Sequence, residues 1–211
     1  MSGKKLSLNK TAHLPEPDDD HWAANSKALR ADAKQNREQI LEAAHQIFAE
    51  KGLSIPIGEI ARRAGVGVGT VYRHFPTKEA LFEAVNIGYK QRLTTEAKSL
   101  LNHPDPGQAF LDFFARILEE GFSNRALKDA FKSGAFNAPA ANCGVFQDFH
   151  AAYANLLARA QQAKAVRQDI DVQDLSTLLV GLLLAIEQPK GAPDISRFKR
   201  LLSIVIEGLR V

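Results

Sequence analysis

The chain has 211 residues, of which 45% are apolar, and it carries 27 Lys plus Arg against 24 Asp plus Glu. This is the composition of a globular protein, and it excludes a wholly disordered chain. A chain of this length buries about 70% of its unfolded surface, so it needs no disulfide or metal to hold a fold together. Because Cys143 is the single cysteine, we expect a protein of the reducing cytoplasm with no cofactor and no bound metal. The longest apolar run, residues 175–186, is too short to cross a membrane.

The N-terminal segment, residues 1–29, is interpreted as a flexible tail. It contains Pro15, Pro17 and the acidic run Asp18–Asp20, and it has few large apolar side chains. Helical spacing of apolar residues begins after it, where Ile40, Ala44 and Phe48 recur with charged residues between them. This spacing predicts a first helix over residues 32–51, which Gly52 terminates.

Two short helices are predicted next. Residues 57–64 form the first, which ends at Gly65, a residue suited to the left-handed conformation after a helix. Residues 68–75 form the second, and Pro76 ends it because proline restricts the residue before it. A fourth helix starts after Thr77 as its N-cap and ends before the Pro-rich break at residues 103–107.

The rest of the chain is predicted to be helical over residues 108–120, 124–134, 143–166, 172–187 and 194–209. No convincing strand alternation is present. The predicted fold is therefore all-α: an N-terminal three-helix helix-turn-helix domain followed by a C-terminal helical bundle. The predicted domains are residues 30–84 and 85–211.

Positive charge is concentrated at the two short helices. Residues 51–78 have a net charge of +4, whereas the whole chain has +3. The basic residues responsible are Lys51, Arg62, Arg63, Arg73 and Lys78, against the single acid Glu59. Two short helices joined by a Gly-containing turn, with this charge, are typical of a helix-turn-helix whose second helix enters the DNA major groove.

The second short helix has two different faces on a helical wheel. Val71 and Phe75, with Val68 nearby, form an anchoring side, and polar residues cover the rest of the arc. Arg73 can hydrogen-bond guanine or hold a phosphate, Thr70 can contact a base edge, and Tyr72 can donate to a phosphate. Gly69 would allow close approach of the backbone, and His74 completes the polar face. The alternative is that these are solvated side chains of a helical bundle.

Lys78 lies in the first turn of the fourth helix, where the helix dipole disfavours a cation. Free backbone N–H groups at a helix start favour an anion. A DNA phosphate bound at this helix start would accommodate both features.

The segment IGEIARRAGVGVGTVYRHFPTKEALFEAV, within residues 30–85, resembles the DNA-binding domain of the TetR family of bacterial transcription regulators. The resemblance implies DNA contacts by Gly69, Thr70, Tyr72, Arg73 and His74, and a phosphate contact by Lys78. Many members have Thr at the N-cap of the second helix, where this chain has Pro56. The phosphate contact of that Thr is lost unless Ser54 or Arg63 replaces it.

The resemblance further implies a C-terminal domain that dimerises and binds an effector. The C-terminal sequence IEGLR is similar to one branch of the family. We therefore expect a ligand-responsive regulator, most simply a repressor that binds near-palindromic operator DNA as a homodimer and is released by a partly apolar small molecule. The alternatives are a DNA-binding protein without ligand control and an all-α enzyme, although no catalytic motif is present.

Two leucine-rich stripes are the candidate dimer surface. The alternative is that both stripes are buried inside one protomer. The residues concerned are Leu175, Leu178, Leu179, Leu182, Leu202, Val205 and Ile206.

An aromatic-rich stretch is the candidate effector pocket, since eight of the twelve phenylalanines lie between residues 110 and 149. Ordinary core packing is the alternative explanation. The candidate pocket residues are Phe110, Phe113, Phe114, Phe131, Phe149 and Tyr153. A metal or thiol sensor built from Cys143 and His150 is a weaker hypothesis. Lys4, Lys5 and Lys10 of the tail either follow a DNA groove or are simply solvated.

Overall fold

The computed structural model describes residues 19–132, 144–185 and 194–211. The chain divides into two units, residues 1–35 and residues 36–211, and each is described by itself. Within the described ranges the regular structure is helical, and the one β-type pairing is an isolated bridge between Val166 and Arg210. The all-α prediction is confirmed.

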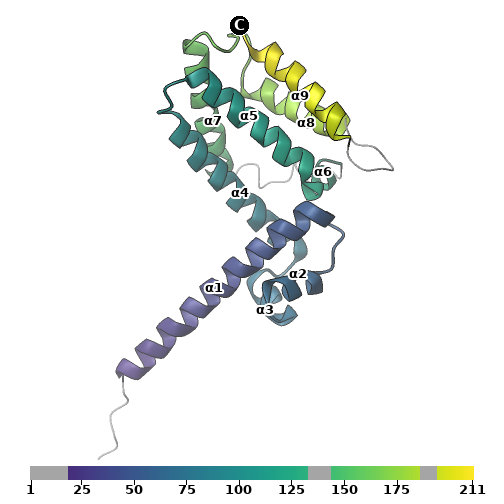
Figure 1. The fold of residues 1–211 in the computed structure, drawn as a ribbon. Coiled ribbons are helices and arrows are strands. Elements are labelled where there is room, and N and C mark those ends of the chain that lie inside the picture. Colours follow the sequence, from purple (N-terminus) through teal and green to yellow (C-terminus); the bar gives the residue numbers. More distant parts are fainter. Residues whose placement is uncertain (1–18, 133–143, 186–193) are drawn as a thin grey trace, which may run out of the picture. The chain divides into compact units, whose positions relative to one another are not determined.

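Figure 1 shows the helices in chain order. Their bounds are α1 Asp19–Lys51, α2 Ile57–Ala64, α3 Val68–His74, α4 Lys78–Leu100, α5 Pro106–Ser123, α6 Arg125–Lys132, α7 Gly144–Gln162, α8 Val172–Ala185 and α9 Ile195–Leu209. These bounds lie within a few residues of the predicted ones, except at the start of α1. None of the helices in the described ranges is both long enough and apolar enough to cross a membrane.

Helix α1 begins at Asp19, well before the predicted start at residue 32, so part of the predicted tail is helical. Residues 27 and 29–35 are exposed. An exposed helix has no apolar stripe, which is why the search for helical spacing missed this part. Its sequence is instead rich in Ala, Lys and Arg, which have high intrinsic helix propensity.

The first hydrophobic core of residues 36–211 joins α1, α2, α3 and the start of α4. We call this part, residues 36–85, the reading head. Ile40 and Phe48 come from α1, Ile60 from α2 and Leu81 from α4, and all four side chains are buried. The Phe48 and Phe82 rings meet edge to face with centroids 5.7 Å apart.

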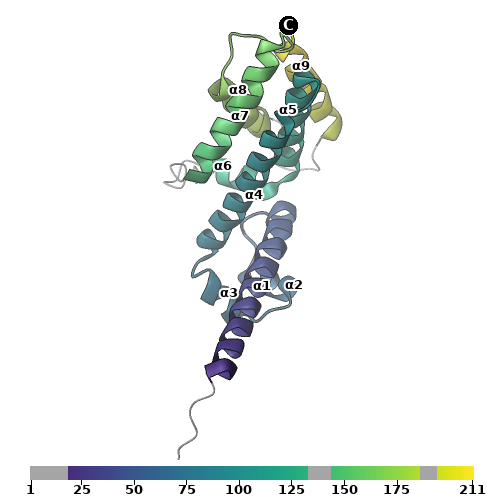
Figure 2. The ribbon, with the colours of Figure 1, turned by 90° about the vertical axis from the view of Figure 1, so that its left-hand side faces the viewer.

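The second core lies in the bundle formed by the rest of α4 with α5, α7, α8 and α9. Figures 1 and 2 both show α7 running alongside α4. In α5, Phe122 stacks on Phe198 of α9 with ring centroids 4.1 Å apart. Helix α4 belongs to both cores, because Val85 packs in the reading head and Leu93 in the bundle. The predicted boundary between residues 84 and 85 therefore falls inside a continuous helix.

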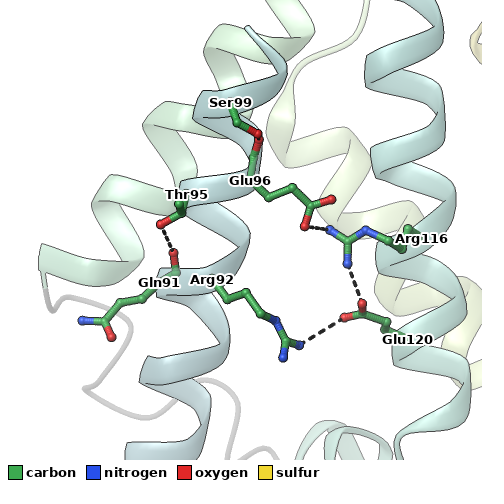
Figure 3. Close-up of polar contacts among 7 residues, drawn as sticks. All are labelled: Gln91, Arg92, Thr95, Glu96, Ser99, Arg116 and Glu120. Carbon is green, nitrogen blue, oxygen red and sulfur yellow. Dashed lines mark hydrogen bonds and ion pairs between the residues drawn. The ribbon is translucent and has the colours of Figure 1, made fainter. Parts of the chain in front are cut away.

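A chain of ion pairs connects α4 to α5 (Figure 3). Arg116 of α5 pairs with Glu96 of α4 and with Glu120 of its own helix, and Arg92 of α4 lies 3.7 Å from Glu120. Exposed pairs contribute little individually, but a network that shares Arg116 and Glu120 fixes the register of the two helices.

The turn between α2 and α3 depends on Gly65, as the sequence predicts. Gly65 has a φ of 69°, in the left-handed region. This conformation lets the Val66 N–H donate to the Ala61 carbonyl at 3.0 Å, which closes the end of α2. The chain then turns directly into α3.

The substitution Gly65→Ala is expected to lower the free energy of unfolding by about 1 kcal/mol, because an alanine is strained in the left-handed conformation. No atom crowds the position where its Cβ would lie, so backbone strain is the only cost. The matched control is Gly88→Ala, an exposed and equally uncrowded position within α4. It is expected to stabilise the protein slightly. Urea denaturation of both variants checks this, and equal effects would contradict it.

Candidate nucleic-acid interface

One face of helix α3 packs against the other helices of the reading head, and its other face is exposed. Val71 is 0% exposed and Phe75, the residue after the helix, is 4% exposed. The Arg37 guanidinium of α1 lies over the Phe75 ring, 5.2 Å from its centroid. Tyr72 is 49% exposed, Gly69 and Arg73 are also exposed, and Thr70 and His74 are half-buried. The structure therefore brings the five predicted residues of this helix to one accessible surface.

Val68 differs from the prediction that it helps to anchor α3. It is 44% exposed. The helix is only seven residues long, and its first residue extends beyond the core that covers Val71. Val68 is therefore an apolar side chain available at the surface beside the polar ones, where it is suited to contact a thymine methyl group.

Arg73 is oriented by its own helix. Its Nη2 donates to Thr70 Oγ1 at 3.1 Å, and its Nε donates to the Gly69 carbonyl at 3.4 Å. These contacts hold the guanidinium along the exposed face and leave other N–H groups for an external acceptor.

Lys78 is the first residue of α4, immediately after the predicted N-cap Thr77. The Thr77 hydroxyl accepts a hydrogen bond from the Ala80 N–H at 3.0 Å, which confirms the capping prediction. Lys78 has no ion-pair partner within the described residues. The start of α4 therefore offers backbone N–H groups and a cation to an anion.

Pro56 occupies the N-cap position of α2, as the sequence indicates. Its side chain makes no capping hydrogen bond. Arg63 donates to Gln46 at 2.8 Å and to Glu50 at 3.3 Å, both on α1. A phosphate contact by Arg63 would thus compete with these exposed bonds. Ser54 is exposed and lacks such partners among the described residues.

Sequence reasoning missed the contact between α6 and the reading head. Ala126 of α6 is buried in the core of the head, and the Asp129 carboxylate accepts a hydrogen bond from the Leu53 N–H at 3.0 Å. Gly52 precedes this amide with a φ of 78°, and a Cβ there would overlap Asp129. Leu53 and Asp129 are 76 positions apart in the chain, so no local sequence pattern predicts their contact.

The predicted effector residues largely come together in the bundle core. The Tyr153 ring is surrounded by those of Phe110, Phe113 and Phe149, with centroids 5.7–6.0 Å away. Phe114 stacks on Phe110 at 6.3 Å. The side chain of Phe131 lies outside the described part of the structure.

The predicted dimer residues divide into a buried group and a more exposed group. For the two buried residues the prediction of a dimer contact is wrong. Leu175 and Leu202 are 0% and 9% exposed, because they pack inside the protomer's own bundle core. Leu179, Leu182, Val205 and Ile206 are half-buried, and Leu178 is exposed. Ile204, which the stripes did not include, is 66% exposed. A dimer surface on these helices therefore involves the outer residues of the stripes.

The suggested metal or thiol sensor gains no support. Cys143 lies outside the described residues, and His150 is exposed. Among the residues that the structure describes, no group of three His, Cys, Asp or Glu side chains is placed to hold a metal.

This arrangement defines a helix-turn-helix transcription regulator: a short exposed helix, anchored by two apolar residues and flanked by cations, beside a helical bundle. Comparison with known families agrees. The model for "Bacterial regulatory proteins, tetR family" matches residues 40–85, and that for "Transcriptional regulator SbtR-like, C-terminal domain" matches residues 105–211. The chain belongs to the TetR family of transcriptional regulators, which are not enzymes.

Individual relatives span most of the chain. A TetR regulator of Mycobacterium vanbaalenii is 39% identical, with 87% of this chain and 99% of that one covered at a TM-score of 0.64. A regulator from Streptomyces coelicolor is 32% identical, with coverage of 82% and 98% and a TM-score of 0.63. The regulator UidR of Escherichia coli K12 is 27% identical over 178 residues, which are 80% of this chain and 88% of that one.

The substitution Asp129→Ala is expected to reduce the free energy of unfolding by about 1–2 kcal/mol, because the Leu53 N–H loses a charged acceptor. Hydrogen exchange of the Leu53 amide should accelerate in parallel. Asp112→Ala is the control, since Asp112 is exposed and, among the described residues, accepts a hydrogen bond from Gln108 alone, one turn earlier in the same helix. If both variants unfold at the same denaturant concentration, the contact between α6 and the head does not contribute as described.

Proposed function

We propose that the chain is a ligand-responsive transcriptional regulator, most simply a repressor that binds a near-palindromic operator as a homodimer and is released by a small-molecule effector. The observation that carries the proposal is the exposed face of α3. Its hydrogen-bonding side chains stand opposite the anchors Val71 and Phe75, and Lys78 follows at the start of the next helix. Such a helix can enter a major groove without disturbing its own packing.

Each exposed residue has a role that its chemistry allows. Thr70 and Arg73 are placed to contact base edges, and Gly69 permits close approach of the backbone. Tyr72 and Lys78 are assigned to phosphates, which position the head on the duplex without reading its sequence. His74 and Arg63 are assigned to the margin of the interface because each is already partly engaged by the protein.

Dimerisation would set the spacing of the two reading heads. In a two-fold dimer the recognition helices read half-sites separated by about 34 Å or a multiple of that distance. An effector that prefers a different spacing shifts the protein away from the DNA-bound geometry. The shared helix α4 and the contact of α6 with Leu53 supply a physical connection between the bundle and the head.

A relative supports ligand control. A gamma-butyrolactone receptor is 25% identical, with 85% of this chain and 90% of that one covered at a TM-score of 0.54. The second candidate is a regulator without ligand control, which keeps the same DNA interface. The unpartnered polar groups in the bundle, described below, favour the first.

Operator binding is tested by selecting binding sites from random duplex DNA with the full-length protein. Fluorescence anisotropy at two salt concentrations then measures affinity for the selected and a scrambled sequence. We expect a sequence with two inverted half-sites and two protomers per site. Equal, salt-sensitive binding to both DNAs would contradict specific recognition.

The substitution Lys78→Ala is expected to weaken binding to all DNA sequences and to reduce the slope of log affinity against log salt by about 1. Tyr72→Ala should also weaken operator binding while leaving the helical circular dichroism intact. Lys98→Ala is the control, because Lys98 is an exposed lysine in the last turn of the same helix. Unchanged operator affinity in both Lys78→Ala and Tyr72→Ala would remove these residues from the interface.

The dimer surface is tested by Ile204→Glu, which places a charge on an exposed apolar position of α9. We expect a shift from dimer to monomer in sedimentation velocity, because burying an unpaired carboxylate at an interface is costly. Gln91→Glu, on the exposed side of α4, is the control. A dimer that persists unchanged in Ile204→Glu would place the two-fold surface elsewhere.

A further inference from the structure

A half-buried lysine of the bundle lies against two aromatic rings. Lys90 lies on α4 and faces the beginning of α7, where Phe146 and Phe149 are located. Its Nζ is 4.3 Å from the centroid of the Phe149 ring and 5.8 Å from that of Phe146. Both distances are within the range of cation–π attraction, which compensates part of the hydration that the ammonium has lost.

The Lys90 ammonium has no acidic partner. No carboxylate of the described residues forms an ion pair with it. Burial lowers the pKa of the Lys90 ammonium to about 8, since a low-dielectric environment disfavours the charged form. At neutral pH the group is still mostly protonated, so the half-buried Lys90 side chain carries a positive charge that no carboxylate of the described residues neutralises.

A second polar group, which shares the Phe149 ring with Lys90, also lacks a hydrogen-bond partner among the described residues. Tyr153 of α7 is buried, and its hydroxyl makes no hydrogen bond to any described residue. Its ring stacks against Phe149, with centroids 5.7 Å apart. Phe149 therefore contacts both the Lys90 ammonium and the Tyr153 ring. Buried polar groups normally find partners, so the Tyr153 hydroxyl and the half-buried Lys90 ammonium around one ring require an explanation.

The chemistry of the two groups restricts the ligand that would satisfy them. Both can donate a hydrogen bond, and Lys90 is positively charged, so the complementary group accepts hydrogen bonds and is negative. A neutral apolar ligand would leave both donors unpaired. A phosphate dianion would meet a single cation and a wall of phenyl rings, too few donors for its charge. A carboxylate attached to an apolar or aromatic body offers the negative charge, the hydrogen-bond acceptors and the apolar surface that the cation, the hydroxyl and the rings call for.

We propose that Lys90 and Tyr153 form the recognition point for the acid group of an apolar carboxylate effector, whose body packs on Phe146 and Phe149. This inference deepens the proposed function, because it rests on the bundle being the effector-binding part. It assigns Lys90, which the sequence did not single out, as the residue that distinguishes an acid from its neutral analogues.

The test uses the full-length protein without DNA and a panel of matched pairs: benzoate, phenylacetate, hexanoate and decanoate, each with its primary amide. Thermal unfolding identifies ligands that raise the Tm, and calorimetry measures their Kd. We expect at least one acid to bind about tenfold or more tightly than its amide, since charge-assisted hydrogen bonds are the strong ones. The proposal is overturned if no acid in the panel binds more tightly than its amide.

Variants assign the preference to its residues. Lys90→Met keeps the length and apolar character of the side chain, and it is expected to abolish the preference for the acid. Lys90→Gln serves the same purpose if the methionine variant does not fold. Tyr153→Phe should weaken the acid's binding by a smaller factor. Lys98→Met, the matched loss of an exposed lysine on α4, should bind like the unsubstituted protein.

Two outcomes would contradict the assignment: acid binding that is unchanged in the Lys90 variants, or an equal loss in Lys98→Met. Because these measurements contain no DNA, they are separate from the test of operator recognition. A protein that prefers acids through Lys90 but selects no operator would refute the DNA-binding proposal alone. The reverse result would refute the effector class alone.

Discussion

Helix α4 is the constraint on which the rest of the structure depends. Its first turns place Leu81 and Val85 in the core of the reading head, and its later turns place Leu93 and Ala97 in the core of the bundle. A continuous helix is stiff over this length, so a rotation or shift imposed at one end reaches the other. A rearrangement of either core that moves α4 therefore also moves the α4 side chains that pack in the other core.

The second connection, through α6, works differently. A buried alanine and one hydrogen bond from a backbone N–H hold α6 against the turn after α1. This contact is small and local, in contrast to the continuous helix α4. The bundle therefore has two connections to the reading head, one a continuous helix and one a small contact. In the proposed function, an effector in the bundle acts on the reading head through these two connections.

The sequence predicted the elements that depend on local signals. Gly65, Thr77 and the apolar spacing in residues 57–75 act through their near neighbours, so the helix-turn-helix and its exposed face could be located in advance. The early start of α1 was missed because an exposed helix has no apolar stripe. The Asp129 contact and the setting of Lys90 were missed because each joins residues far apart in the chain, on helices whose mutual register the sequence does not encode locally.

The stripes of α8 and α9 show a related difficulty. A leucine that packs in its own protomer and one that faces a partner have the same spacing, and only the burial of Leu175 and Leu202 separates them. The aromatic stretch was ambiguous for the same reason. Phenylalanines alone fit a solid core, and the feature that supports the proposed ligand site is the Tyr153 hydroxyl, which has no hydrogen-bond partner among the described residues.

The shortness of α3 has a consequence for how such proteins diversify. A helix of seven residues does not persist by itself in water, so its existence depends chiefly on the buried anchors Val71 and Phe75. Substitutions at exposed positions without structural partners usually change stability by less than about 0.5 kcal/mol. In the proposed DNA interface, DNA preference and fold stability thus depend mainly on separate positions of the same short segment. A lineage carrying this scaffold can acquire a new operator by changing its exposed residues, with little risk to the protein that presents them.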